Sequence, residues 1–417
     1  MDQAVAEPFI VIGGGIVGLC CALQLQSRFR QVTICDPGDL KRAATYGNAG
    51  QLAVGEVVPL AGPDVLRSLP KWMADPLGPL AIRWQYFPYA VPWFLRFIRE
   101  GRMSRVEQIS RHMALLCDLI DQDYPPLLHA AGAENLIVNK DYLRLYRNED
   151  EWRSEGYRWA LREKAGLKFD VWRDDQLRAY APYIAPQFSF GVTMKGRKFI
   201  SSLPRLHKAL QDLFRARGGT VISDEVRGFE TSENKVSAVL LESGRRAPVS
   251  HAIVAAGAWS GRLTSKLGDQ VPLESERGYH VMLPDPGVSP DRTISYVSRG
   301  LVVIPMQEGL RLAGTVEFAG LDAPPNSARA EKLIEAARVV LPGLRTSGAE
   351  FWMGHRPSLP DALPIIDRSS RFANVYYAFG HGHMGLSWAA TTGRFLAGLV
   401  TGTQNKAELE PFRLSRF

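Results

Sequence analysis

Near its start the chain reads FIVIGGGIVG, from Phe9 to Gly18. The first four residues are apolar without a break, which is typical of a strand buried on both faces. Gly13, Gly15 and Gly18 then match the spacing GxGxxG, and residues 19–26 favour a helix. In such a turn the first glycine permits a tight bend, the second lets the backbone approach a pyrophosphate, and the third lets helix and strand pack closely.

A second expected strand, residues 31–35, ends at the carboxylate of Asp36. An acid at this distance from the glycines accepts hydrogen bonds from a ribose, while free N–H groups at the helix start bind the pyrophosphate. The strand–helix–strand unit therefore predicts a dinucleotide site. Asp36 in place of an arginine disfavours NADP, and the motif by itself leaves FAD and NAD open.

The composition is that of a globular protein of 417 residues, which is enough for two or three domains. Apolar residues make up 46% and charged residues 22%, which excludes disordered chains, fibres and coiled coils. No apolar run reaches the roughly 18 residues of a transmembrane helix, and no signal peptide is expected. Neither the four cysteines nor the histidines show metal-ligand spacing, so we expect buried free thiols, a cytoplasmic location and no metal site.

The chain carries a formal net charge of +7 and has a sequence pI near 9.2. A positive charge can attract nucleic acid, an anionic membrane or an anionic substrate. Lys and Arg are dispersed among acidic residues, without a basic block or a nucleic-acid motif. We therefore expect no nucleic-acid partner.

Hydrophobic patterning predicts further strands and helices along the rest of the chain. The expected strands lie within residues 135–146, 168–173, 221–223, 236–241, 251–256, 278–283, 300–305, 310–316 and 375–379. The expected helices are residues 104–131, 150–166, 201–217 and 325–341. Residues 45–51 are predicted to form a loop, and the proline-rich residues 351–367 an extended, rigid loop.

Residues 60–100 are rich in aromatic residues, prolines and arginines. Two interpretations are open. Short helices could pack over a substrate cavity, since Pro88 and Pro92 interrupt a long amphipathic helix. Alternatively, the aromatic and arginine side chains form an interfacial patch at a membrane surface.

Five motifs stand in a fixed order along the chain. They are the glycine fingerprint, YGNAGQ at 46–51, AAGAWS at 255–260, GHRP at 354–357 and GHGHMG at 380–385. Together they resemble the D-amino-acid oxidase superfamily of flavoenzymes over residues 8–403, with bacterial D-amino-acid dehydrogenase small subunits as the nearest branch. The resemblance implies an α/β fold: a Rossmann-type FAD-binding domain and an α+β substrate domain with a mixed sheet. The implied FAD-binding domain is residues 1–60, 195–270 and 350–417, and the implied substrate domain is residues 61–194 and 271–349.

The resemblance also implies the cofactor, FAD, and the residues that hold it. These are Gly13, Gly15, Ile16, Val17, Gly18, Asp36, Arg42, Thr45, Asn48, Ala49, Gly50, Gln51, Leu52, Val226, Ala256, Gly257, Trp259, Gly382, His383, Met384, Gly385, Leu386 and Ser387. No cysteine stands in the segment 380–385, where relatives with covalently attached flavin carry one, so non-covalent FAD is expected.

Three residues are implied at the substrate. Arg356 matches the family arginine that binds the substrate carboxylate, for which a planar guanidinium is suited. Tyr279 and His280 fall on the strand that lines the substrate site in the family. Because neighbouring strand residues face opposite sides, at most one of them points inward, and His280 is favoured. His381 and His383 either tune the flavin or shape the turn.

The implied reaction is oxidation of a D-amino acid, or of an imino acid of the D-proline or hydroxy-D-proline type. Hydride passes from the α-carbon to flavin N5, and the imine hydrolyses to a 2-oxo acid and ammonia. The electron acceptor is a quinone or other carrier, or oxygen, and the location is cytoplasmic or peripheral at the inner face of the cell membrane.

Other functions stay open at this point. The chain could be a subunit of a glycine, sarcosine or opine oxidase complex, a non-catalytic flavin-binding subunit, or an NAD-dependent dehydrogenase. One departure from the dehydrogenase branch concerns substrate identity: residues 195–198 read KGRK, where relatives often carry acidic residues. The oligomeric state is not implied.

Overall fold

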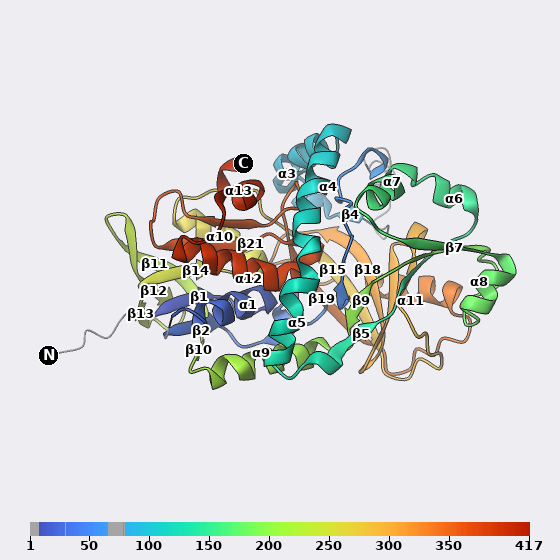
Figure 1. The fold of residues 1–417 in the computed structure, drawn as a ribbon, viewed down its shortest axis with the longest axis horizontal. Coiled ribbons are helices and arrows are strands. Elements are labelled where there is room, and N and C mark those ends of the chain that lie inside the picture. The colour runs from blue at the N-terminus through green and yellow to red at the C-terminus, as the bar shows by residue number, and fades with distance from the viewer. Residues whose placement is uncertain (1–7, 30, 66–77, 79) are drawn as a thin grey trace.

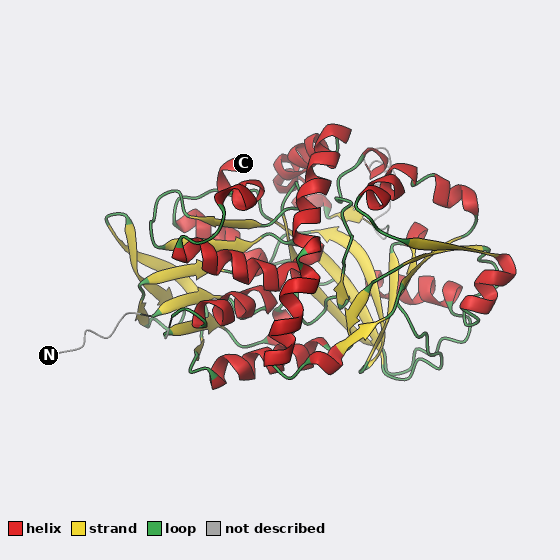
Figure 2. Ribbon diagram, viewed as in Figure 1, coloured by secondary structure: helices red, strands yellow, loops and turns green. Residues whose placement is uncertain are grey.

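The computed structural model describes residues 8–29, 31–65, 78 and 80–417. Two large sheets lie next to each other along the long axis of the molecule, one in each half of Figure 1. Helices gather over the first sheet and along the boundary with the second, as Figure 2 shows. The α/β fold expected from the resemblance is confirmed.

The first sheet has six strands in the order β10-β2-β1-β14-β21-β20, parallel except for β20. Its strands are β1 (Phe9–Ile12), β2 (Val32–Asp36), β10 (Thr220–Ser223), β14 (His251–Val254), β20 (Ile365–Arg368) and β21 (Val375–Phe379). All four residues of β1 are buried, as the unbroken apolar run predicts. Alternate side chains enter two cores: Phe9 and Val11 face one, and Ile10 and Ile12 the other.

Helices α1 (Ile16–Gln26), α9 (Leu203–Ala216) and α12 (Gly385–Thr401) cover the first of these cores. The helices α1 and α12 pack so closely that a Cβ at Gly393 would lie 2.6 Å from the carbonyl oxygen of Cys20. The second core is covered by α10 (Ser260–Lys266) and by the antiparallel strands β11 (Val226–Ser232), β12 (Lys235–Leu241) and β13 (Arg246–Pro248). All four cysteines are buried free thiols.

The second sheet is mixed and has nine strands. They are β4 (Leu80–Ile82), β6 (Tyr142–Tyr146), β7 (Phe169–Arg173), β8 (Phe190–Met194), β15 (Glu274–Leu283), β16 (Ile294–Tyr296), β17 (Leu301–Met306), β18 (Gly309–Phe318) and β19 (Glu350–Ser358). All ten residues of β15 are buried, because β18 and β19 flank it and α11 (Ser327–Val340) packs against it. Four shorter helices are α6 (Glu149–Arg153), α7 (Gly156–Lys164), α8 (Asp174–Tyr180) and α13 (Lys406–Leu409).

A further small sheet has three strands in the order β3-β9-β5. Its members are β3 (Gln51–Leu52), β5 (Ile137–Asn139) and β9 (Lys198–Ile200). The pairing of β3 with β9 ties the end of the expected flavin loop to the KGRK segment, since Leu52 lies opposite Lys198.

Three expectations about local structure differ from the fold. The helix expected over 150–166 is two short helices, α6 and α7, with residues 154 and 155 between them. The helix expected over 104–131 is two helices, α4 (Met103–Asp118) and α5 (Ile120–Ala130). Leu119 separates the two helices, and Pro125 and Pro126 lie within α5. Both helices pack against α12 on the first core, although residues 61–194 were expected in the substrate unit.

The rigid loop expected over 351–367 contains a strand, β19, and the start of β20. Only residues 359–364 between them lie outside a strand. Pro357 is compatible with β19 because this edge strand pairs with β15 alone, so no second neighbour needs its missing N–H group. The pairing places β19 in the second sheet, although residue 350 onward was expected in the FAD-binding unit.

Helix α3 (Phe87–Glu100) buries Trp93, Phe94 and Phe97 against Phe318 of β18. Within the described part of residues 60–100, no side chain lines the large cavity described below, so these helices do not cover it. The rest of this prediction concerns residues 66–77 and 79, which lie outside the described residues. Among the described residues, no helix is long and apolar enough to cross a membrane.

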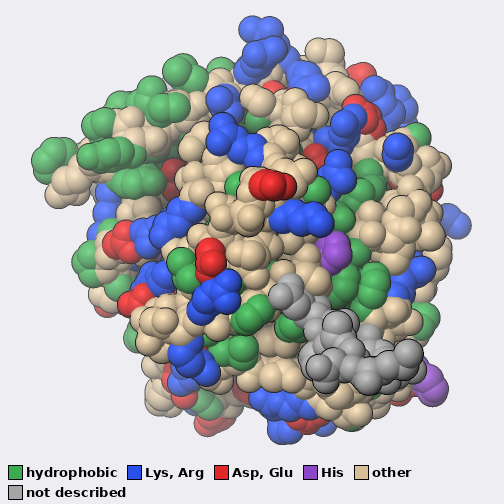
Figure 3. Space-filling view, turned by 90° about the vertical axis from the view of Figure 1, so that its left-hand side faces the viewer, with side chains coloured by type: hydrophobic (Ala, Val, Ile, Leu, Met, Phe, Trp, Pro, Cys, Tyr) green, Lys and Arg blue, Asp and Glu red, His purple; other side chains and the backbone are tan. Residues whose placement is uncertain are grey.

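Surface charge is mixed on the face shown in Figure 3. Lys and Arg side chains are spread over it with Asp and Glu between them, and do not form one continuous basic field. This matches the dispersed charge of the sequence.

Candidate active site

A cavity of about 940 Å³ lies between the two main sheets and takes residues from both. Most of the residues expected to hold the cofactor line it. They are Gly13, Gly15, Ile16, Val17, Asp36, Arg42, Thr45, Asn48, Ala49, Gln51, Val226, Ala256, Gly257, Trp259 and residues 382–387. The expected substrate residues Arg356 and Tyr279 line it as well. Segments far apart in the sequence therefore converge on one elongated site.

Three expected cofactor residues do not line the cavity: Gly18, Gly50 and Leu52. A Cβ at Gly18 would lie 1.9 Å from the carbonyl oxygen of Gly13, so this glycine serves the close packing of α1 on the turn. Gly50 has a positive φ of 70°, and a Cβ there would lie 2.7 Å from the carbonyl oxygen of Ile200. Leu52 is a buried core residue.

The glycine turn after β1 has the geometry of a pyrophosphate site. Gly13 adopts φ +109°, and Gly15, the N-cap residue of α1, lines the cavity. Asp36 accepts hydrogen bonds from the N–H groups of Gly14, at 2.7 Å, and Gly38, at 2.8 Å. A carboxylate has about four acceptor sites, so Asp36 keeps capacity for ribose hydroxyl groups.

Replacing Gly13 by alanine is expected to abolish FAD retention and destabilise the protein. The φ of +109° costs an L-residue about 1–3 kcal/mol, and the new Cβ would lie 2.5 Å from the carbonyl oxygen of Ala255. The measurement is flavin absorbance per polypeptide after purification, together with thermal unfolding.

The matched variant for this test is Gly15→Ala. Gly15 has an ordinary φ of −66°, and its new Cβ would meet only Thr45 Oγ1, at 3.5 Å. Gly15→Ala should therefore lose FAD affinity while keeping the unfolding temperature of the apoprotein. Full FAD occupancy in both variants would contradict a pyrophosphate at this turn.

The segment Tyr46–Gln51 is held rigidly beside the cavity. Arg311 donates from Nη1 to the carbonyl oxygens of Tyr46, at 3.2 Å, and Asn48, at 2.5 Å. Asn48 Oδ1 in turn accepts the N–H of Gly50 at 2.8 Å. Ser387 at the start of α12 donates to the carbonyl oxygen of Gln51 and accepts the N–H of Ala53, both at 3.0 Å. This loop and the start of α12 are thereby fixed to each other.

The N-terminus of α12 is suited to stabilise negative charge on the edge of a flavin ring. A short 3₁₀ turn, Gly382–Met384, leads into the helix at Gly385, and residues 382–387 all line the cavity. A helix N-terminus presents free N–H groups and a positive dipole end. His381 just before it is fully enclosed and bonded to Thr392 Oγ1 at 2.9 Å. Burial lowers the pKa of His381 to about 3, so it is a neutral residue that shapes the turn.

Arg356 is supported by a buried carboxylate, that of Glu276. These two residues lie directly opposite each other on β19 and β15, with Arg356 Nη1 3.2 Å from Glu276 Oε1. Glu276 is completely buried and also contacts His383 Nε2, at 2.9 Å, and the hydroxyl of Ser358, at 3.1 Å. Burial would raise the pKa of Glu276, but His383 and Arg356 outweigh that effect and lower the pKa to about 2. Glu276 lies outside the five sequence motifs.

Arg356 crosses over Gly278 to reach the cavity. A Cβ at position 278 would lie 2.3 Å from Arg356 Nη2. The ladder between β15 and β18 shifts register at this point, between Arg277 and Tyr279. Such a bulge next to a site is a common way to aim a side chain.

Of the two neighbouring residues on β15, neither presents a free polar group to the cavity. Tyr279 lines it, but its hydroxyl donates to Glu317 at 2.6 Å, and the ring packs in the core between the nine-stranded sheet and α11. His280, the favoured residue, does not line the cavity; its ring stacks on Trp352, with centroids 4.8 Å apart, and Nδ1 lies 3.3 Å from the carbonyl oxygen of Gly47. Burial and the nearby Arg311 lower the pKa of His280 to about 3. Its position indicates a packing role.

The same cavity has polar residues that the motifs did not mark. Glu56, Tyr142 and Arg197 line it from the substrate side, with Met194 beside them. Arg197 lies in the KGRK segment, which in the sequence resembles a solvated charge run. Only the β3–β9 pairing, which no local pattern reveals, brings it inside.

These residues fit FAD. The cavity runs continuously from Asp36 and Val226 to the loop at Asn48 and the start of α12. Along this path lie a glycine turn that a Cβ would fill, a carboxylate with free acceptor capacity and a helix N-terminus. We expect Gly13 and Gly15 at the pyrophosphate, Asp36 at the ribose, and residues 48–51 with 382–387 at the flavin ring.

Comparison with known proteins identifies the family of the chain. The family model described as FAD dependent oxidoreductase, DAO, matches residues 9–399. The D-amino-acid oxidase of Bradyrhizobium diazoefficiens is 38% identical over 419 residues, covering 98% of each chain. A D-amino acid dehydrogenase of Vibrio vulnificus is 25% identical and covers 97% of this chain and 99% of its own. Iminodiacetate oxidase from Chelativorans sp. shares the fold, with a TM-score of 0.74 at 20% identity over 97% of this chain and 98% of that one. The family resemblance is confirmed: the chain belongs to the DAO family of FAD-dependent oxidoreductases.

Proposed function

We propose that the protein oxidises a D-amino acid, with Arg356 binding the α-carboxylate at the flavin end of the cavity. The observation that carries this proposal is the Arg356–Glu276 pair beside residues 382–387. The name of the 38%-identical relative, D-amino-acid oxidase, supports the D-configuration. Bound FAD supplies the acceptor, flavin N5, for the hydride of the α-carbon.

The chain itself contributes binding, orientation and desolvation. A guanidinium that holds the carboxylate in two-point fashion fixes the α-C–H bond relative to the ring. The apolar walls at Val302 and Ala313 exclude water and favour the neutral amine, which is the reactive form. We assign no general base: the histidines that line the cavity, His355, His381 and His383, are engaged with Ser275, Thr392 and Glu276, and His280 lies outside it. The imine released from the site hydrolyses to a 2-oxo acid and ammonia.

Anaerobic spectroscopy tests this proposal. The purified protein is mixed with matched D- and L-amino acids, D-proline and hydroxyproline isomers, and absorbance near 450 nm is followed. Bleaching by a D-amino acid and not by its L-enantiomer is the expected result. A yellow protein that no amino acid bleaches would contradict the proposal and favour a flavin-binding subunit. Release of all FAD on denaturation is expected for non-covalent attachment.

A membrane-associated electron acceptor is part of the proposal. Exposed apolar side chains gather on and next to α3, at Trp84, Phe87, Tyr89, Leu95, Ile98 and Met103; we call them the α3 patch. Trp84 is 78% exposed, Tyr89 74% and Leu95 64%. Arg96, Arg99 and Arg102 are exposed among them. Apolar anchors mixed with basic residues are typical of surfaces that bind anionic lipid headgroups.

Vesicle sedimentation checks this surface. The protein is expected to bind vesicles that contain anionic lipid, and less so at high salt, because salt screens the arginines. Replacing Trp84 and Leu95 together by serine should lower the bound fraction by about tenfold or more, since each apolar side chain contributes roughly 1.5–3 kcal/mol when buried. Val339→Ser, at an exposed apolar residue on α11, is the matched control. Equal binding by all three proteins would remove the α3 patch as the contact.

A further inference from the structure

A second arginine, Arg197, lines the cavity at its substrate side. Its side chain is nearly enclosed, with 4% of the residue exposed. Nη2 lies 3.1 Å from Glu56 Oε2 and 3.6 Å from the sulfur of Met194. Among the residues that the structure describes, Nε of Arg197 has no hydrogen-bond partner.

The backbone brings Arg197 close to the flavin loop. It follows a turn at Gly196, which has φ +69°, and immediately precedes β9. Strand β9 pairs with β3, so Phe199 lies opposite Gln51, a residue of the loop expected at the flavin ring. Arg197 and Arg356 therefore line the same cavity, Arg197 from the residue before β9 and Arg356 from β19.

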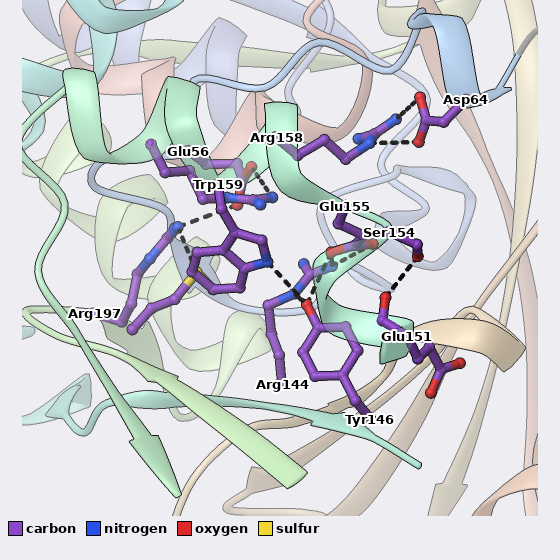
Figure 4. Close-up of polar contacts among 12 residues, drawn as sticks. Glu56, Asp64, Arg144, Tyr146, Glu151, Ser154, Glu155, Arg158, Trp159 and Arg197 are labelled. Atoms are coloured by element: carbon purple, nitrogen blue, oxygen red, sulfur yellow. Dashed lines mark hydrogen bonds and ion pairs between the residues drawn. The ribbon is translucent and has the colours of Figure 1, made fainter. Parts of the chain in front are cut away.

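The surroundings of Arg197 carry excess positive charge. Glu56 is shared by Arg197 and Arg162, with 3.1 Å to each guanidinium. Arg144 pairs with Glu155 at 3.0 Å. Figure 4 shows this pair and the Glu56–Arg197 pair on either side of Trp159. Among these five side chains, Arg144, Arg162 and Arg197 carry positive charge, and Glu56 and Glu155 carry negative charge. A buried charge without a counter-charge is costly, so an anion from a ligand would be favoured here.

Glu56 is not available to bind a cationic ligand group. Each of its carboxylate oxygens already accepts a hydrogen bond from a guanidinium. Burial would raise the pKa of Glu56, but Arg162 and Arg197 outweigh it and lower the pKa to about 2. The carboxylate is therefore fixed in its ionised form and orients Arg197 toward the cavity.

We infer that Arg197 binds a second anionic group of the substrate, so that the enzyme acts on amino acids with a carboxylate side chain. This inference rests on the proposed function, in which Arg356 holds the α-carboxylate. Arg356 and Arg197 would then bind the two carboxylates of one molecule, with the α-carbon between them. Arg197 is thus a specificity-determining residue.

Matched ligand pairs test the inference in the FAD-loaded protein. D-Glutamate is compared with D-glutamine, and D-aspartate with D-asparagine, in anaerobic flavin reduction. A charge-assisted hydrogen bond in a desolvated site predicts a preference of about 10- to 100-fold for the acid. In parallel, glutarate and pentanoate, which differ by one carboxylate, are titrated as non-reactive ligands by the shift of the flavin spectrum. Glutarate is expected to bind more tightly by a similar factor.

Arg197→Met removes the charge and keeps the length, and it is expected to abolish both preferences. Lys195→Met is the matched control, because Lys195 is 40% exposed in its side chain, pairs with Asp170 and does not line the cavity. Equal use of acid and amide by the unmodified enzyme, or a preference that survives Arg197→Met, would overturn the inference while leaving the proposed function intact. If no amino acid reduces the flavin, the proposed function fails, and the comparison of glutarate with pentanoate still decides the role of Arg197.

Discussion

Replacing Arg356 by alanine is expected to lower kcat/KM for the D-amino-acid substrate by about 100- to 1,000-fold while FAD stays bound. Two charge-assisted hydrogen bonds to a carboxylate correspond to roughly 3–4 kcal/mol, and each 1.36 kcal/mol is tenfold in rate. FAD retention is expected because Arg356 lies on β19, away from the glycine turn and from Asp36. Flavin absorbance per polypeptide and anaerobic reduction kinetics measure the two effects separately.

Two further variants distinguish the role of this guanidinium from a general loss of structure. Arg356→Lys keeps the charge but not the planar fork, so an intermediate loss is expected. Gly278→Ala keeps Arg356 but places a Cβ 2.3 Å from its Nη2, so it should raise KM by displacing the side chain. Unchanged KM and kcat in Arg356→Ala would remove this residue from the substrate site.

The part of the site that binds dinucleotide could be predicted because its chemistry is local. The strand, the glycine turn and the helix are consecutive, and the acid that completes them ends the next strand. Two of its three glycines meet a geometric requirement in the structure: Gly13 has a positive φ, and Gly18 permits close packing of α1 on the turn. Such constraints act within a few tens of residues, so they leave a readable pattern.

The substrate side could be predicted only in part, because its contacts are made by long-range strand pairing. Glu276 lies in the sequence ESERGYHVML, in which all ten residues are buried, so no alternation distinguishes a functional carboxylate from its neighbours. Its partner Arg356 is 80 residues away along the chain. Arg197 lies in the charged segment KGRK, and only the long-range pairing of β9 with β3 places it at the cavity. His280 was favoured from strand alternation, which cannot tell a cavity from a packed aromatic cluster; Trp352 occupies that side.

Replacing Glu276 by glutamine is expected to destabilise the protein by about 2–4 kcal/mol and to raise KM more than it lowers kcat. Removing one member of a buried ion pair typically costs 3–5 kcal/mol, and the partial exposure of Arg356 and His383 lowers that figure here. Without the Glu276 carboxylate, Arg356 loses the partner that orients it across Gly278. The substitution is therefore expected to weaken mainly the binding of the substrate carboxylate, which raises KM. Denaturant unfolding measures the loss of stability. Steady-state kinetics with the D-amino acid that reduces the flavin measure KM and kcat.

The contribution of Glu276 to the free energy of unfolding depends on pH. The pKa of Glu276 is lowered from 4.5 to about 2 in the fold, so its stabilising effect is fully present above pH 4.5 and is lost as the pH falls toward 2. Glu276→Gln resembles the protonated state, and the stability difference between the two proteins should shrink as the pH falls through that window. Ser358→Ala is the control, because it removes only one hydrogen bond to Glu276, worth about 1 kcal/mol, and leaves the contacts of Glu276 with Arg356 and His383 in place. If Glu276→Gln were no more disruptive than Ser358→Ala, the charge of Glu276 would not be what holds Arg356, and the geometry of β15 and β19 alone would suffice.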